Sequence, residues 1–260
     1  MRVVPTRRLW LGALGLLMFL LVWQLTSALG LVDSQYLPYV TDVFARLLEE
    51  LRDLAFWRRL GLTMTSWAIG LAVATVAAVV LGTVVGLVPF LRRATHTMVE
   101  FLRPIPSVAL IPLAVLVFGL QMRAALVIIV YASFWQVFVQ VIYGVADVDT
   151  VARDTARSFR LTRRERLRFL VLPTLLPYLL TGVRLAAAVA LILAITAEMV
   201  IGNPGLGRMI ELSRSAGDAV GLYALVVVTG FLGLLVNLVF RFIERRSLAW
   251  HQSVRTEEAH

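Results

Sequence analysis

The sequence predicts an all-α membrane protein, a single polytopic domain over residues 1–260 with six transmembrane helices. Two observations predict this class: 60% of the residues are hydrophobic, where a soluble domain is close to half apolar, and the excess lies in long, charge-poor runs. Each run can supply the roughly 20 residues that a spanning helix needs. The expected spans are 10–29, 62–90, 104–122, 124–146, 172–198 and 219–241.

The distribution of arginine predicts the orientation of these spans. With the first residues in the cytoplasm, the cytoplasmic segments hold 17 Arg and the external segments hold 7, which agrees with the positive-inside rule. We therefore expect both ends of the chain in the cytoplasm, an N-in and C-in topology. The same distribution explains the formal charge of +9 without a nucleic-acid partner. The first run could also be a signal peptide, but its length favours a retained helix.

Two absences from the composition narrow the function. The chain has no Cys, which excludes disulfides and Cys-bound metals, and no Lys, which a phosphate-binding P-loop requires. If ATP drives this protein, another subunit must bind the nucleotide. The three His residues lack metal-ligand spacing, and no pair of carboxylates lies within a span. A membrane enzyme is therefore disfavoured, and we expect no metal and no cofactor on this chain.

Two segments outside the spans have helical patterns. Residues 42–59 place apolar side chains at helical spacing among charges, which predicts an amphipathic helix on the external surface. This helix either packs against its neighbours or docks a partner. The cytoplasmic loop 147–171 is the longest polar insertion, and its pattern predicts two short helices joined by a turn near 159–162. Pro173 is then expected to start the next helix, where its missing N–H does no harm.

The cytoplasmic loop also has the spacing of a known motif. Permeases of ABC importers carry Glu-Ala-Ala, three residues, Gly, nine residues and Ile-x-Leu-Pro, and this loop resembles that motif when the last Pro is placed on Pro173. Asp154, Thr155 and Ala156 then take the first three positions, and Arg160 takes the position of the Gly. The resemblance implies that the first short helix docks on an ATPase subunit. The coupling residues that it implies are Asp154, Thr155, Ala156, Arg157, Arg160, Leu172 and Pro173.

Arg160 is the main departure from the motif. If the Gly of the family supplies a turn with positive φ, an Arg would be strained at this position. Either Arg160 accepts that strain or the turn has shifted along the chain. A solvated basic loop that only obeys the positive-inside rule is the other interpretation of this segment.

Two further segments carry a more specific resemblance. Residues 102–120 read LRPIPSVALIPLAVLVFGL, and three prolines make this helix unusual, because proline removes backbone donors and lipid cannot satisfy the freed carbonyls. Residues 197–207 read AEMVIGNPGLG, a glutamate followed by a Gly-rich turn. Both segments, and the late FIERRSLAW, resemble permeases of the nitrate, taurine and aliphatic-sulfonate importers. The resemblance covers about residues 36–250.

A few polar residues lie within the spans. Arg184 and Glu198 are the ionisable ones, and at 14 residues apart, about 21 Å along a helix, they cannot pair within one helix. Gln136 and Gln140 share a helix face, and they either line a polar pathway or hydrogen-bond to a neighbouring helix. A structural role is favoured for Arg184, while Glu198 is a gate residue or an interfacial one. The candidate residues of the pathway or gate are Pro104, Pro106, Pro112, Gln136, Gln140, Arg184, Glu198, Gly202, Gly205 and Gly207.

The resemblance implies a function and a set of partners. It implies the permease subunit of an ATP-driven importer in the inner membrane, in which two permease copies, expected to be identical, form the pathway. Two ATP-binding subunits would hold ATP and Mg, and an external binding protein would deliver a small organic anion, such as a sulfonate, nitrate or an aromatic carboxylate. The alternative is an ion-coupled secondary transporter, which needs coupling residues at mid-membrane and often an inverted repeat. The sequence offers only Arg184 and no repeat.

Overall fold

The described part of the chain is helical throughout. A computed structural model describes residues 6–248, and these residues contain no β-strand, so the expected all-α class is confirmed. The elements are α1 (Thr6–Ala28), α2 (Val40–Arg52), α3 (Leu54–Leu87), α4 (Pro89–Leu102), the 3-10 turn η1 (Ser107–Leu110), α5 (Ile111–Phe118), α6 (Met122–Ala146), α7 (Thr150–Ser158), α8 (Arg163–Arg166), the π-helical turn η2 (Leu167–Val171), α9 (Leu172–Ile201), α10 (Leu206–Ser215) and α11 (Ala219–Ser247).

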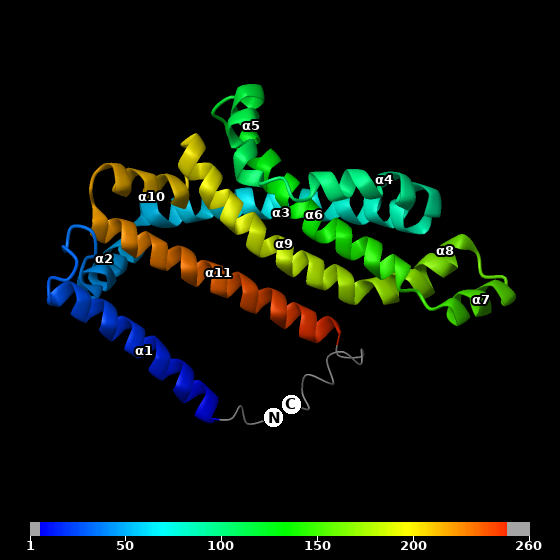
Figure 1. The fold of residues 1–260 in the computed structure, drawn as a ribbon, viewed down its shortest axis with the longest axis horizontal. Helices are drawn as coiled ribbons and strands as arrows, with labels where there is room; N and C mark the ends of the chain where they lie inside the picture. The colour runs from blue at the N-terminus through cyan, green and yellow to red at the C-terminus, as the bar shows by residue number, and fades with distance from the viewer. Residues whose placement is uncertain (1–5, 249–260) are drawn as a thin grey trace.

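The long helices form an elongated bundle with two distinct ends. Helices α2 and α10 lie at one end, and α7 and α8 lie at the other (Figure 1). We call these the α10 end and the α7 end. Five helical segments of the described chain are long and apolar enough to cross a membrane: Trp10–Ala28, Leu54–Leu87, Met122–Ala146, Arg163–Ile201 and Ala219–Ser247. They correspond to five of the six expected spans.

Helix α6 is the centre of the bundle and packs between α3 and α9. Small residues let these helices approach closely. In lipid there is no hydrophobic driving force between helices, so close packing of this kind holds them together. A Cβ on Gly82 of α3 would lie 2.8 Å from Cγ1 of Val141, and a Cβ on Gly144 of α6 would lie 2.8 Å from Cδ1 of Leu175. The resulting core is built mainly of alanine, valine, leucine and isoleucine side chains, with the aromatic rings of Trp135 and Phe138.

The third expected span, 104–122, is not one helix, and that expectation is wrong. Helix α4 ends at Leu102, the chain bends by 84°, and η1 with α5 follows. Proline is the cause, because Pro106 has no N–H to donate to the carbonyl of Leu102. That carbonyl accepts instead from the Ile105 N–H at 3.2 Å and from the Tyr131 hydroxyl of α6 at 2.7 Å. If the bent pair is one span, the described chain has six.

The amphipathic helix is shorter than expected, and the second span is longer. Helix α2 ends at Arg52, and Asp53 caps α3 by accepting a hydrogen bond from the Ala55 N–H at 2.9 Å. Residues 54–59 therefore begin α3 rather than end the amphipathic helix. The apolar face of α2 packs on α11, where Val43 and Leu47 are buried with Ala224.

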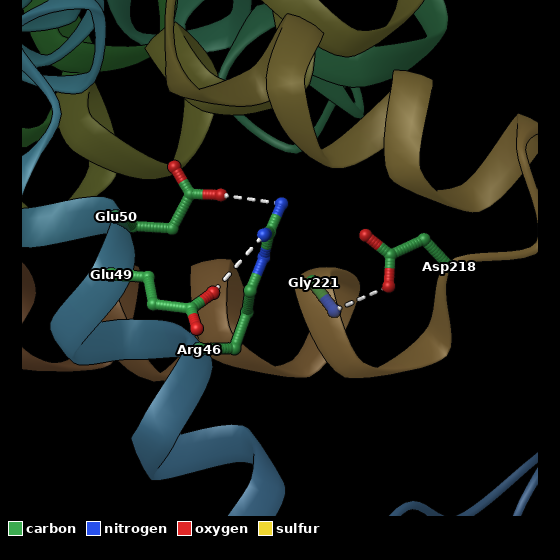
Figure 2. Close-up of polar contacts among 5 residues, drawn as sticks. All are labelled: Arg46, Glu49, Glu50, Asp218 and Gly221. Carbon is green, nitrogen blue, oxygen red and sulfur yellow. Dashed lines mark hydrogen bonds and ion pairs between the residues drawn. The ribbon is translucent and has the colours of Figure 1, made fainter.

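Polar contacts near the α2–α11 junction each lie within a single helix or its cap. In Figure 2, Arg46 of α2 reaches Glu49 and Glu50 one turn further along the same helix, at 3.3 and 3.1 Å. In the same view Asp218 caps α11 by accepting from the Gly221 N–H at 2.9 Å. The burial of Val43 and Leu47 against Ala224, and not these contacts, favours the packing role of α2, and its partner-docking role stays a prediction.

Helix α1 joins the bundle through one end only. Trp23 donates to the carbonyl of Pro38 at 3.0 Å and packs on Tyr223 of α11. From there α1 diverges from α11 towards its first turn (Figure 1). Its other apolar side chains, such as Phe19 and Leu16, are exposed and therefore suited to contact with lipid.

Candidate functional site

The first candidate site is the cytoplasmic loop, which forms the two short helices that the sequence predicts. Helix α7 begins at its cap Asp149, which accepts from the Ala152 N–H at 2.8 Å. Asp154 and Thr155 are exposed on α7, whereas Ala156 is buried. Asp154 pairs with Arg157 at 3.2 Å. The motif positions therefore form one exposed helical turn anchored by a buried small residue.

Arg160 closes α7 in the conformation that a glycine usually supplies. Its φ is 54°, and within residues 6–248 it is the one non-glycine residue with positive φ. The Leu161 N–H donates to the Ala156 carbonyl at 3.0 Å, and the Arg160 N–H donates to the Arg157 carbonyl at 2.9 Å. This pair of bonds is the Schellman ending of a helix, in which Gly is the favoured residue at the position of Arg160. The turn has not shifted, and Arg160 accepts the strain.

The second short helix is continuous with the fifth span. Thr162 and Glu165 form a reciprocal capping box at the start of α8, with the Thr162 N–H donating to Glu165 Oε2 at 2.7 Å. From Arg163 the chain stays helical through η2 and α9 to Ile201, over 39 residues. Pro173 does lie in the first turn of α9, as expected, but α9 is not a separate helix, because it continues from η2.

A π-helical turn explains how Pro173 fits inside this helix. The Leu172 N–H donates to the Leu167 carbonyl, five residues back, so the hydrogen-bond register widens just before the proline. The Thr174 hydroxyl donates to the Leu170 carbonyl at 2.9 Å. The loop end of this helix also presents apolar side chains to solvent, with Leu172 and Phe169 exposed.

The second candidate site lies at the opposite end of α9, around Glu198. This side chain is 2% exposed, and its Oε2 accepts from the Thr63 hydroxyl of α3 at 2.9 Å and from the Gly207 N–H at 3.0 Å. The Thr63 oxygen in turn accepts from the Leu206 N–H at 2.9 Å. Glu198 is therefore a buried residue that joins α3, α9 and the start of α10, and it does not lie at the surface of the bundle.

The glycines after Glu198 are required by this close approach. Gly202 ends α9 with a φ of 86°, in the left-handed region. A Cβ on Gly205 would overlap the Glu198 carboxyl group, and a Cβ on Gly207 would overlap the Ile195 carbonyl oxygen. The Gly-rich turn thus folds back over the end of α9 and seats α10 against it.

Helix α10 carries charged residues on its exposed side. Arg214 donates to both Glu211 carboxylate oxygens, at 2.8 and 2.7 Å. These hydrogen bonds lower the pKa of Glu211 to about 2, so the carboxylate stays charged at any physiological pH.

Arg184 has a partner that the sequence did not indicate. Its guanidinium lies 2.9 Å from Glu244 of α11, and the Thr181 hydroxyl donates to the same carboxylate at 3.3 Å. An ionisable residue inside a span usually pairs in this way, because an isolated charge is costly in lipid. The pair supports a structural role for Arg184.

The remaining candidates are not gathered into one site. Gln136 and Gln140 both lie on α6. The Cβ of Gln140 packs against Gly182 of α9, and Gln136 is half-buried. Pro104, Pro106 and Pro112 lie at the α4–α5 bend. No group of three His, Asp or Glu residues that could hold a metal ion occurs within residues 6–248. Sequence reasoning missed Thr63 and Glu244, since nothing local marks a residue whose partner is 135 or 60 positions away.

The described residues thus form a helical bundle with five helical segments long and apolar enough to cross a membrane, and with the short helices α7 and α8 at one end. These features define the class of polytopic membrane proteins. Residues 70–248 match the family of binding-protein-dependent transport system inner membrane components. The chain belongs to this family, and it is therefore a multi-pass protein of the inner membrane and a permease subunit of ABC transport systems.

Relatives and solved structures agree with this family. The chain is 29% identical to the taurine transport system permease protein TauC of Escherichia coli strain K12, over 96% of this chain and 93% of the relative. It is 26% identical to the nitrate import permease protein NrtB of Leptolyngbya laminosa, over 74% of this chain and 68% of the relative. The fold resembles a chain of the MetNI methionine ABC transporter in inward-facing conformations, with a TM-score of 0.59 and 20% identity over 73% of this chain and 93% of that chain.

Proposed function

We propose that this chain is the permease of an ATP-driven importer for a small anionic solute. The family supports the transport role, and the α7 geometry is the observation that carries the coupling: an exposed helix of nine residues, closed by a Schellman turn, leads directly into the 39-residue helix that ends at Ile201. A displacement of α7 therefore acts on the end of a helix about 57 Å long.

The energy source lies outside this chain. Because the chain has no Lys for a P-loop, two ATP-binding subunits would hold ATP and Mg. They would contact Asp154, Thr155, Ala156, Arg157 and Arg160 on the loop, with Leu172 and Pro173 where the loop joins the long helix. The exposed side chain of Phe159, which the sequence motif does not specify, lies beside Arg160 and adds an apolar contact.

The remaining partners follow from the same family. A second, identical permease copy would complete the pathway, and an external binding protein would deliver the solute at the α10 end. We therefore propose that the α7 end and both ends of the chain lie in the cytoplasm, which the arginine distribution supports. Taurine and nitrate, named for two relatives, share an oxyanion group, and that shared chemistry supports a solute such as a sulfonate. We place the pathway near Gln136, Gln140 and the bend that contains Pro104, Pro106 and Pro112.

The coupling surface is tested with Phe159→Ala in the full-length complex. Phe159 is 76% exposed, and truncating a central apolar anchor of an interface commonly costs more than 1 kcal/mol. We expect ATP hydrolysis per mole of purified permease to fall about fivefold or more. Phe19→Ala is the matched control, because Phe19 is 61% exposed on α1, which lies apart from α7 in Figure 1. Equal losses from both variants would contradict the assignment of α7.

The energy source is tested with the reconstituted complex. Uptake of radiolabelled taurine into sealed vesicles is expected to require ATP together with the binding protein. Uptake by the purified chain alone, driven by a proton or sodium gradient, would instead support the ion-coupled secondary transporter.

A further inference from the structure

The start of α10 is capped by residues from two other helices. The first N–H groups of a helix have no partner within it, and Gly205 at the cap position has no side chain to offer. Thr63 of α3 accepts from the Leu206 N–H, and Glu198 of α9 accepts from the Gly207 N–H. The carboxylate also lies where the dipole of α10 favours negative charge. Together these two side chains accept the hydrogen bonds that an N-cap side chain would otherwise accept.

Both side chains are buried, so water cannot replace them. Thr63 is 0% exposed and Glu198 is 2% exposed. Removing either one leaves at least one buried N–H without an acceptor, which is costlier than losing a hydrogen bond at the surface. The other contacts of α10 with α3, α9 and α11 are apolar and undirected. They are made by the cluster of Leu206, Ile210, Phe56 and Leu225, against which Ile195 and Met199 of α9 also pack.

Glu198 also lies near one end of the continuous helical segment whose other end joins the α7 loop. This segment runs from Arg163 to Ile201, and Glu198 is three residues from its end. Movement of the loop therefore displaces the Glu198 carboxylate along with the helix that carries it.

We propose that Glu198 and Thr63 are positioning residues that make α10 follow α9, so that ATP-driven movement at the α7 end reaches the α10 end. The inference rests on the proposed function and deepens it. Without the two side chains, apolar contacts, among them those of Ile195 and Met199 on α9, would still hold α10 on the bundle, but no directed bond would fix its position along α9. The pair thus transmits movement without contacting the solute.

The test uses spin labels in the reconstituted complex, and the absence of native Cys means that an introduced Cys is the single labelling site in each permease chain. Ser215→Cys reports the distance between the α10 helices of the two permease copies, and Ser158→Cys reports the distance between their α7 helices. Both residues are exposed. In the otherwise unchanged chain we expect ATP with vanadate to shift both distances.

In Thr63→Val the shift at Ser215 is expected to fall about fivefold or more, while the shift at Ser158 remains. Glu198→Ala should act in the same way, and Thr63→Ser should restore the shift at Ser215, because it keeps the hydroxyl. Thr65→Val is the matched control, since the Thr65 hydroxyl is exposed and bonds only within its own helix, to the Gly61 carbonyl at 2.8 Å. If Glu198→Ala does not fold, the near-isosteric Thr63→Val decides alone.

The outcomes separate the two proposals. A full shift at Ser215 in Thr63→Val, alongside a full shift at Ser158, overturns the positioning role and leaves the importer function standing. No ATP-dependent shift at Ser158 in the chain without these variants overturns the proposed function, and the positioning role with it.

Discussion

At the residue scale, Arg160 holds a conformation that its side chain disfavours. A non-glycine residue in the left-handed region costs about 1 kcal/mol relative to glycine, and the cost is tolerated where surrounding contacts fix the turn. Here two backbone hydrogen bonds fix it, from the N–H groups of Arg160 and Leu161. The strain is therefore stored next to the exposed surface of α7.

Arg160→Gly should relieve this strain. We expect the turn to be more stable by about 1 kcal/mol, which slows amide hydrogen exchange at Arg157–Leu161 by about fivefold. Arg153→Gly is the matched control, because Arg153 is exposed within α7, where Gly destabilises a helix and should speed exchange. Faster exchange in Arg160→Gly would show that the positive φ of Arg160 carries no strain.

In the Gly205–Gly207 turn, replacing a glycine should destabilise the protein, whereas introducing a glycine at Arg160 should stabilise it. Gly207→Ala would push a methyl group into the Ile195 carbonyl oxygen, and overpacking of this kind typically costs about 1–3 kcal/mol. We expect the Tm of the purified protein in detergent to fall by several degrees. Gly230→Ala on α11 has open space around the added Cβ and should leave the Tm unchanged or raise it. An unchanged Tm in Gly207→Ala would mean that the turn is loosely packed.

At the element scale, hydrophobic runs made most helices predictable, and long-range contacts decided the rest. Helices such as α6 and α11 were found because a span needs about 20 apolar residues. The length of α3 was underestimated because residues 58 and 59 are charged, and a membrane span was expected to begin only after them. The prolines indicated an unusual helix before α5, but they did not indicate that the Tyr131 hydroxyl of α6 would bond to the Leu102 carbonyl at the bend.

The candidate sites divide in the same way. The α7 loop was predictable, because local helix periodicity and the motif spacing act within a few residues. Glu198 and Arg184 were recognised as charges inside spans, but their partners Thr63 and Glu244 were not. A partner on another helix is set by packing, and no local pattern in one sequence records it.

The Arg184–Glu244 pair links α9 to α11 and should depend on both charges. Glu244→Ala leaves Arg184 without its counter-ion, and since both side chains are partly exposed we expect a loss of about 1 kcal/mol in stability. The double variant Arg184→Leu with Glu244→Leu should recover part of this loss, because it leaves no unpaired charge. Glu100→Ala is the control, since its carboxylate is 67% exposed and pairs only with His96. A Tm series in detergent measures all three, and a double variant less stable than Glu244→Ala would contradict the pairing.

At the scale of the whole molecule, the bundle separates its two candidate sites by the length of α9. The α7 loop and the Glu198 contacts lie at opposite ends of one helical segment, and α6 packs along its side. An importer needs this separation, because ATP is used on one side of the membrane and solute arrives on the other. The separation of the α7 loop from the Glu198 contacts can serve import only if the two ends of the bundle face different compartments.

That requirement gives a direct test of topology with the same Cys-free chain. Ser158→Cys at the end of α7 and Ser215→Cys at the end of α10 place one exposed thiol at each end of the bundle. In intact cells, a membrane-impermeant maleimide should label Ser215→Cys and leave Ser158→Cys unlabelled until the inner membrane is permeabilised. The positive-inside rule predicts this direction, since seven Arg lie between residues 153 and 168. Labelling of Ser158→Cys from outside would reverse the orientation, and it would place the α7 loop on the side of the membrane where no ATP is present.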